Sequence, residues 1–451
     1  MARWIVTLGL YVLAAIGGAG ADEVQRYDLS ACIRAALQNA PDLSAAAADL
    51  AGARARLAEA NAGRFGQAEL RQYVGLVNEA KGNVLFSPND KNDVFEGLGP
   101  FTKVDVDVAI PVWTFGKLDA ALRAAQEGLE SERANGESRR AAVVLDVKRL
   151  YYGLLLSRQL SAILHDNLDT LDKAVIRTQE RLDAGSTSVT ELDLLKLKAG
   201  RARFAKGVVQ VDGSIDLTRS ALARMIGLPL ERDFDIADRR LQPADASIGP
   251  LNTYLEQGPD RRPETRQLVT GIAAQSAKVD LEEAGYYPNF FVATGFQYAW
   301  ASNRTEQTNP FVYDNFNYIR PVFVLGVQWD LNVFKTTAKL DEARADLQRL
   351  QARQREAASG LQLEIRRAYG EVAQARDTIQ ATEEGRKAGR AMLVLTVANF
   401  DLGIGEADEL FTGLGTYTEA SSDYMRAVHD YNVAVATLSK AVGQELTTVK
   451  Y

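Results

Sequence analysis

Few side chains in this sequence are of the types that carry out chemistry, and their spacing does not suit it. The chain has two histidines, His165 and His429, and one cysteine, Cys32. These are too few and too scattered to supply a transition-metal site. Asp105 and Asp107 could form a general acid–base pair, but they alternate with apolar residues on the exposed side of a strand pattern. No Ser/His/Asp cluster or phosphate-binding glycine loop accompanies them. We therefore expect no enzyme, no cofactor and no metal.

Composition narrows the class of protein further. The 451 residues include 52 Lys and Arg against 59 Asp and Glu, a net charge of −7. A general nucleic-acid binder needs a basic surface to displace counterions, so this balance argues against nucleic acid as a partner. Hydrophobic residues make up 46% and charged residues 25%, which is typical of a folded chain.

The N-terminus has the three regions of a secretory signal peptide. Arg3 is followed by an apolar run from 4 to 16, and Ala19-Gly20-Ala21 is a small-x-small cleavage site. We predict a signal peptide over 1–21 and export of the mature chain. Cys32 ends a lipobox-like stretch, but the residues before it are charged. We therefore expect it to be buried in a helix and not lipidated.

The sequence repeats internally. Leu182 to Gly185 recurs as Phe400 to Gly403, an offset of 403 − 185 = 218, and Lys117-Leu118-Asp119 recurs as Lys339-Leu340-Asp341, an offset of 222. Further matches follow in the same order, which indicates duplication of one unit. We predict a first repeat over 22–228, a linker over 229–260 and a second repeat over 261–451. Each repeat should contain a helix, two strands, a long helix and a second helix.

The long helices should span about 117–182 and 337–400. Between Leu340 and Ile379, small and apolar residues recur about every 3.5 residues, which is coiled-coil spacing. A helix over 337–400 would be about 95 Å long. That length suits a rod better than a globular domain.

The predicted strands alternate between apolar and polar residues. They cover 69–77, 104–113, 289–300 and 322–333. Period two with one apolar face predicts half-buried strands, and about ten residues with bordering aromatics is typical of an outer-membrane barrel. A soluble sheet packed on the helices has the same periodicity. In the barrel, the residues facing the lumen would be Asp105, Asp107, Gln328 and Asp330.

Four strands cannot close a pore, and open strand edges are unstable in lipid. Three copies would supply 3 × 4 = 12 strands. The predicted fold is therefore mostly α with a small β part: a long α-helical coiled-coil barrel plus a 12-stranded outer-membrane β-barrel shared by a trimer. The hydrophilic segments 78–103 and 301–320 would be the outer loops.

Over essentially the whole mature chain, the sequence resembles the outer-membrane efflux proteins of the TolC family. The resemblance lies in the paired helix–turn–helix tips around Gly185 and Gly403, in Tyr287-Pro288 before a strand, and in Trp113 to Gly116 after one. It implies a homotrimer in outer-membrane lipid, with a helical tunnel in the periplasm. It also implies a passive duct that works with a periplasmic adaptor protein and an inner-membrane pump of the RND or ABC type.

The resemblance assigns adaptor contacts to the two tips. The glycines there suit left-handed helix ends, and the hydroxyls after Gly185 could cap the next helix. The residues expected to contact an adaptor are Asp183, Gly185, Ser186, Thr187, Ser188, Asp401, Gly403, Gly405 and Glu406.

The resemblance also places a constriction near the tips. Thr190 and Glu191 stand where relatives carry one side of a latch. Phe400 and Gly405 stand where well-known members have a Tyr and an Arg, so that latch cannot form here. Another tip Arg or Lys, or apolar closure by Phe400 and Phe411, could replace it. Glu409 would form an acidic ring that favours cations, and Thr412 stands where a second carboxylate is common.

Two alternatives remain open. A secreted structural coiled coil without a pore would share the long helices but not the aromatic strands. Within the resemblance, the exported cargo could be small molecules, in a tripartite efflux system, or proteins, in a type I secretion system. The sequence does not separate these two cargo classes.

Overall fold

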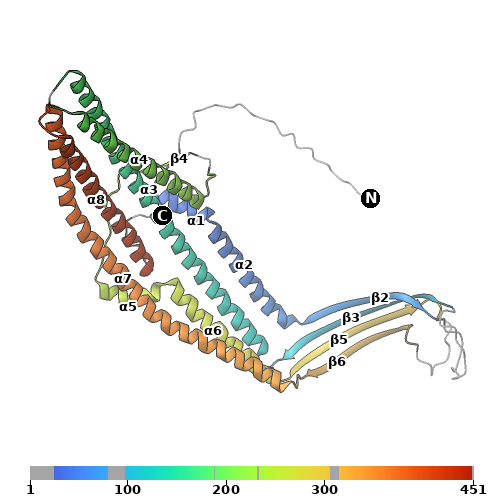
Figure 1. Cartoon of the computed structure of the whole chain (residues 1–451). Helices are drawn as coiled ribbons and strands as arrows, with labels where there is room; N and C mark the ends of the chain where they lie inside the picture. Colours follow the sequence, from blue (N-terminus) through green and yellow to red (C-terminus); the bar gives the residue numbers. More distant parts are fainter. Residues whose placement is uncertain (1–24, 80–96, 187, 231–232, 305–313, 449–451) are drawn as a thin grey trace, which may run out of the picture.

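The computed structural model describes residues 25–79, 97–186, 188–230, 233–304 and 314–448 (Figure 1). The predicted signal peptide and parts of the two predicted outer loops lie outside these ranges. The described elements are β1 (Gln25–Tyr27), α1 (Leu29–Asn39), α2 (Pro41–Ala62), β2 (Gln67–Val77), β3 (Gly99–Trp113), α3 (Lys117–Asp183), α4 (Glu191–Ile226), β4 (Phe234–Ile236), α5 (Leu251–Arg261), α6 (Pro263–Glu283), β5 (Asn289–Ala301), β6 (Tyr318–Gln328), α7 (Val333–Leu402) and α8 (Ala407–Ala441).

The two repeats have the predicted order of elements. The first runs α2, β2, β3, α3, α4 and the second runs α6, β5, β6, α7, α8. Figure 1 shows one elongated molecule, with the sheet at one end and the α3–α4 and α7–α8 turns at the other. The helices α3 and α7 have 67 and 70 residues, so each is about 100 Å long. Helix α3 begins where predicted and ends one residue later, and α7 exceeds its predicted bounds by a few residues at each end.

The segment between the repeats contains regular structure. Strand β4 pairs in parallel with β1, and α5 occupies residues that we predicted as linker. The side chain of Asn432, only 1% exposed, accepts a hydrogen bond from the Ala244 amide at 2.8 Å and donates one to the Gln242 carbonyl at 2.9 Å. The connection is thus fixed to α8.

Four strands form one antiparallel sheet in the order β2-β3-β5-β6. Strand β6 ends at Gln328, whereas the alternating pattern predicted a strand to Val333. The reason is that Gln328 pairs with Asn289, the first residue of β5, so the following residues have no neighbour in the ladder. Asp330 therefore lies in the connection to α7 and not in the predicted strand.

The register gives the sheet one polar and one apolar face. Directly paired residues point to the same side, and one row across the four strands is Arg71, Asp105, Gln297 and Arg320. The opposite face carries mostly apolar residues, many of them exposed, including Leu70, Val74, Ile110, Phe296, Phe323, Leu325 and Val327. Separately, no helix among the described residues is long and apolar enough to cross a bilayer.

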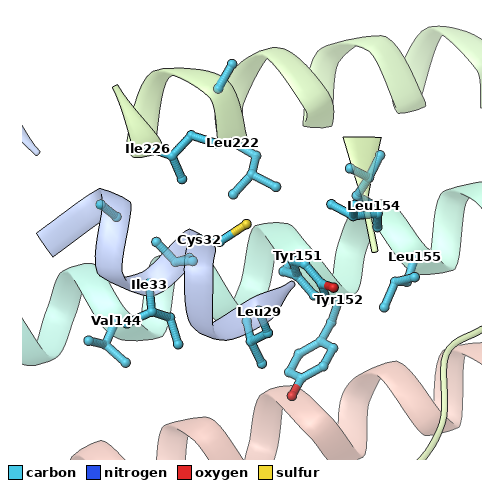
Figure 2. Packing of buried hydrophobic residues seen from close by; sticks show 14 of the residues in the cluster. Leu29, Cys32, Ile33, Val144, Tyr151, Tyr152, Leu154, Leu155, Leu222 and Ile226 are labelled. Carbon is cyan, nitrogen blue, oxygen red and sulfur yellow. The ribbon is translucent and has the colours of Figure 1, made fainter. Parts of the chain in front are cut away.

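A hydrophobic core lies midway along the helical body, where α1 packs between α3 and α4 (Figure 2). Cys32 is fully buried there beside Leu222 and Tyr151, as predicted for a residue inside a helix. Burial raises the pKa of the Cys32 thiol to about 12. Tyr151 is also buried, and its hydroxyl donates to Asp238 at 2.7 Å.

A buried ion-pair cluster joins α6 to α3 and α7. Arg262 is 4% exposed and donates to Glu264 at 3.1 Å and to Glu364 at 2.6 Å. Ser138 donates to Glu264 at 2.7 Å. Burial by itself raises the pKa of Glu264, but the hydrogen bonds from Arg262 and Ser138 outweigh it and hold this pKa below its ordinary value.

This cluster predicts a specific acid sensitivity. A carboxyl group whose pKa is lower in the folded protein than in the unfolded chain stabilises the fold at pH values above its unfolded pKa of about 4.3. This stabilisation is lost as the pH falls through the pKa of the folded protein. We expect Glu264→Gln to be less stable than the parent at pH 7 but to lose less stability between pH 5 and pH 3. The test is the free energy of unfolding of both proteins, measured with a chemical denaturant at pH 7, pH 5 and pH 3. Equal pH dependence in both proteins would contradict the assignment.

Candidate functional site at the helical tips

The two turns farthest from the sheet have the same backbone design. Gly185 and Gly403 both have positive φ, at 73° and 80°. At the first tip, the amides of Gly185 and Ser186 bond back to the carbonyls of Leu182 and Arg181, each at 3.0 Å. At the second tip, the amides of residues 403 and 404 bond back to the carbonyls of residues 400 and 399, each at 3.1 Å. This is the pattern that ends a helix at a left-handed glycine, as predicted for both.

The start of α4 differs from the prediction. The helix is capped by Thr190, whose Oγ1 accepts from the Asp193 amide at 3.2 Å, while the Asp193 carboxylate accepts from the Thr190 amide at 3.0 Å. This reciprocal pair is a capping box. The prediction that Ser186 or Ser188 caps the helix was therefore wrong: these hydroxyls bond to each other at 2.8 Å. Thr187 lies outside the described residues.

Removing this cap should loosen the first tip. We expect Thr190→Ala to cost about 1 kcal/mol, because the first amides of α4 lose their acceptor. Hydrogen exchange at the start of α4 should rise accordingly. Ser188→Ala is the matched control and should change exchange little. Equal effects of the two changes would contradict the role of Thr190.

Three basic side chains tie the two tips together within one protomer. Arg181, in the last turn of α3, donates to the backbone carbonyls of Phe400 at 3.3 Å and of Asp401 at 2.9 Å. Arg177, one turn earlier, pairs with the Asp401 carboxylate. Between α4 and α8, Lys196 donates a hydrogen bond to Asp408 at 2.7 Å. This hydrogen bond raises the pKa of Lys196 above its ordinary value.

From the sequence, a tip Arg or Lys was considered only as a replacement for the missing latch, and these residues were not identified. Arg177 and Arg181 are four residues apart, so they lie on one face of α3. That spacing alone could have indicated two basic side chains on the same side of the helix near the tip. Their partners are more than 200 residues away, and local spacing does not reveal them.

An apolar cluster lies next to these contacts and joins the same helices. Phe400 is 5% exposed and packs between the hairpins. Its neighbours in the cluster are Leu171, Ala174, Leu197, Ala407, Leu410 and Leu414. The hypothesis that Phe400 closes the passage directly is therefore not supported, because its ring is enclosed within the protomer. Phe411 packs at the edge of the same cluster.

The other predicted tip residues lie at the surface. Glu191 and Glu409 are exposed in the first turns of α4 and α8. Thr412 is exposed, and its hydroxyl donates to the Asp408 carbonyl at 2.8 Å. Among the residues expected to contact an adaptor, the exposed ones are Asp183, Gly185, Ser188, Asp401 and Glu406, and the half-buried ones are Ser186, Gly403 and Gly405. Both turns therefore present residues at the surface of one end of the molecule.

Three of the four predicted lumen residues share the polar face of the sheet, and the fourth, Asp330, lies beyond the end of β6. Asp107 pairs with Arg71 at 2.6 Å. Asp105 is 5% exposed and pairs with Lys103 at 3.0 Å. Gln328 lies on the same face by register. Within the described ranges, no three His, Cys, Asp or Glu side chains are grouped closely enough to hold a metal.

The sequence is similar to known proteins over most of its length. The family model "Outer membrane efflux protein" matches residues 32–228 and 255–444. Protein CyaE of Bordetella pertussis is 23% identical over 350 residues, which cover 75% of this chain and 70% of that protein. The fusaric acid resistance protein FusA of Burkholderia cepacia is 23% identical over 252 residues, which cover 53% of this chain and 46% of that protein.

Solved structures show the same fold. The CmeC outer membrane channel of Campylobacter jejuni has a TM-score of 0.76 at 14% identity, with 98% of this chain and 95% of that chain covered. The outer-membrane channel OprN has a TM-score of 0.74 at 19% identity, with 92% and 89% covered. Since the family model spans both repeats, including both tips and all four strands of the main sheet, the chain belongs to the outer membrane efflux protein family.

Proposed function

We propose that this outer-membrane efflux channel works as a homotrimer and is the outer component of a tripartite efflux or type I secretion system. Its partners would be a periplasmic adaptor protein and an inner-membrane pump of the RND or ABC type. The observation that carries the proposal is the four-stranded sheet. Its apolar face is exposed, and among the residues that the structure describes, its two outer strands, β2 and β6, have no neighbour on one side.

The sheet supports assembly into a closed barrel. Unpaired backbone groups cannot stay in lipid, so β2 and β6 need partners from other copies. All neighbours in the sheet are antiparallel and the number of strands is even. The β6 strand of one copy therefore runs antiparallel to β2 of the next, and the pattern closes without a mismatch. Three copies give twelve strands. The interior of an eight-stranded barrel is filled by its own side chains, so a barrel of twelve strands is wider than that.

The helical tips support a gated entrance. The hairpin turns lie at the end opposite the sheet (Figure 1), which is the periplasmic end when the sheet is in the outer membrane. The contacts made by Arg177, Arg181 and Lys196 cross between the two hairpins within each copy. We propose that an adaptor engages the exposed tip residues and that the pump supplies the energy for transport.

The channel itself provides a path and no chemistry. The relative FusA is named for resistance to fusaric acid, which favours a small molecule as cargo. Export of proteins remains the second candidate. A pump and adaptor that copurify with the channel would distinguish the two systems.

The first test is the mass of the purified mature protein in detergent, followed by conductance in planar bilayers. We expect a trimer with small channels that prefer cations. A soluble, non-conducting monomer or dimer would contradict the proposal.

The acidic tip predicts the ion preference. Glu409 is exposed in the first turn of α8, and three copies would form a ring of carboxylates that attracts cations. We expect Glu409→Ala to lower the cation preference of the channel. Glu419→Ala, an exposed carboxylate further along α8, is the control. Unchanged conductance and selectivity in Glu409→Ala would exclude the proposed ring.

A further inference from the structure

We infer that β6 of one copy pairs with β2 of the next in the register that places Leu325 opposite Val74 of the partner subunit. The inference rests on the proposed trimer and adds the alignment of its strands. It follows from the internal repeat, because the structure contains one junction between repeats and the trimer requires a second, equivalent one.

The first strands of the two repeats are equivalent at a fixed offset. Helices α2 and α6 begin at Pro41 and Pro263, and 263 − 41 = 222. Strands β2 and β5 begin at Gln67 and Asn289, and 289 − 67 = 222. The same offset through helix and strand means that each residue of β2 has its counterpart in β5 at 222 positions later.

The second strands are related through their pairing. Leu70 of β2 pairs with Val106 of β3. The counterpart of Leu70 is residue 70 + 222 = 292, and Val292 of β5 pairs with Leu325 of β6. Val106 and Leu325 therefore occupy equivalent positions in the two repeats.

The junction within the protomer then gives the junction between copies. Strand β3 pairs with β5, and Val106 lies opposite Phe296. The equivalent of Val106 is Leu325, and the equivalent of Phe296 is residue 296 − 222 = 74. The equivalent contact is thus Leu325 opposite Val74 of the partner subunit.

The side chains fit this register. Leu325 and Val74 are 78% and 77% exposed in the protomer, and both lie on the apolar face. Two residues along, Phe323 falls opposite Leu76 of the partner subunit. On the polar face, Gln328 falls opposite Arg71 of the partner subunit. These three pairs match in character, and Val327 opposite Gln72 of the partner subunit is a mixed pair on the apolar face. A slip by one residue would reverse every side chain.

The register also lengthens β6. Trp329 and Asp330 have no neighbour on β5, but they fall opposite Leu70 and Glu69 of the partner subunit. Two carboxylates directly opposite each other repel. Arg71 pairs with Asp107 and lies 3.7 Å from Glu69 in the protomer. It is also diagonal to Asp330 in this register, so its charge offsets part of this repulsion. We therefore expect β6 to gain Trp329 and Asp330 only on assembly.

Cysteine cross-linking tests the register. Leu325→Cys combined with Val74→Cys, in a Cys32→Ala background, is oxidised in isolated outer membranes and analysed without reductant. The matched control combines Leu325→Cys with Gln72→Cys. Residue 72 lies on the same face of the sheet as residue 74 but is two residues, or about 6.8 Å, away along the strand. We expect about tenfold more covalent trimer from the first pair, because directly opposite Cβ atoms are only about 5 Å apart.

The outcomes separate the register from the assembly. A dominant cross-link in the Gln72→Cys pair would overturn the register, and so would the absence of a cross-link in both pairs. In either case, a trimeric mass of the parent protein would leave the proposed assembly intact. A parent protein that is not trimeric by mass would overturn both.

Discussion

Replacing Phe323 with arginine will abolish stable assembly in the outer membrane. Phe323 is at the midpoint of β6, is 71% exposed and lies on the apolar face. An arginine on the lipid side of a barrel costs about 2–4 kcal/mol at the bilayer centre, which is about 6–12 kcal/mol across three copies. The measurement is the amount of heat-modifiable trimer in outer-membrane fractions.

The adjacent residue provides the control. Val324 is also exposed, at 44%, but its side chain lies on the polar face because side chains alternate along a strand. We expect Val324→Arg to assemble nearly as well as the parent. If both variants assembled equally, the apolar face would not be the lipid face and the barrel would be wrong.

Leu410→Ala will separate the two hairpins at the tips. Leu410 is 1% exposed within the cluster that contains Phe400 and Leu197. Removing a buried leucine side chain costs about 2–5 kcal/mol through lost burial and the remaining cavity. The ion pairs beside it are partly exposed and contribute little each. We therefore expect faster proteolysis at both tips and larger, noisier channels in bilayers.

Leu402→Ala is the matched change at the same tip. Leu402 is 75% exposed, so its truncation should alter stability by less than about 0.5 kcal/mol. Similar proteolysis of the two variants would show that the cluster does not hold the hairpins together.

The regular elements were predictable because their signals are local. Apolar spacing in α7 predicted a helix over 337–400, and the helix covers Val333–Leu402. The glycines at both tips were predicted from their positions alone, since a left-handed helix end needs little else. The duplicated order of motifs predicted the repeat.

The errors occurred where a distant partner decides the structure. The alternating pattern of β6 continues past Gln328, but a strand ends where its neighbour ends. Phe400 follows a segment with apolar residues on several sides of α7, so its sequence does not tell which face packs on α3 and α8. The partners of Arg177 and Arg181 were missed for the same reason.

The burial of Cys32 has a consequence for biogenesis. A thiol reacts with oxidants and with disulfides only as the thiolate, and Cys32 is both sealed in the core and held protonated by a pKa of about 12. Once α1 has docked, this thiol is protected from forming a mixed disulfide in an oxidising compartment. The same thiol becomes a natural reporter, since labelling by maleimide will occur only in copies whose α1 has detached.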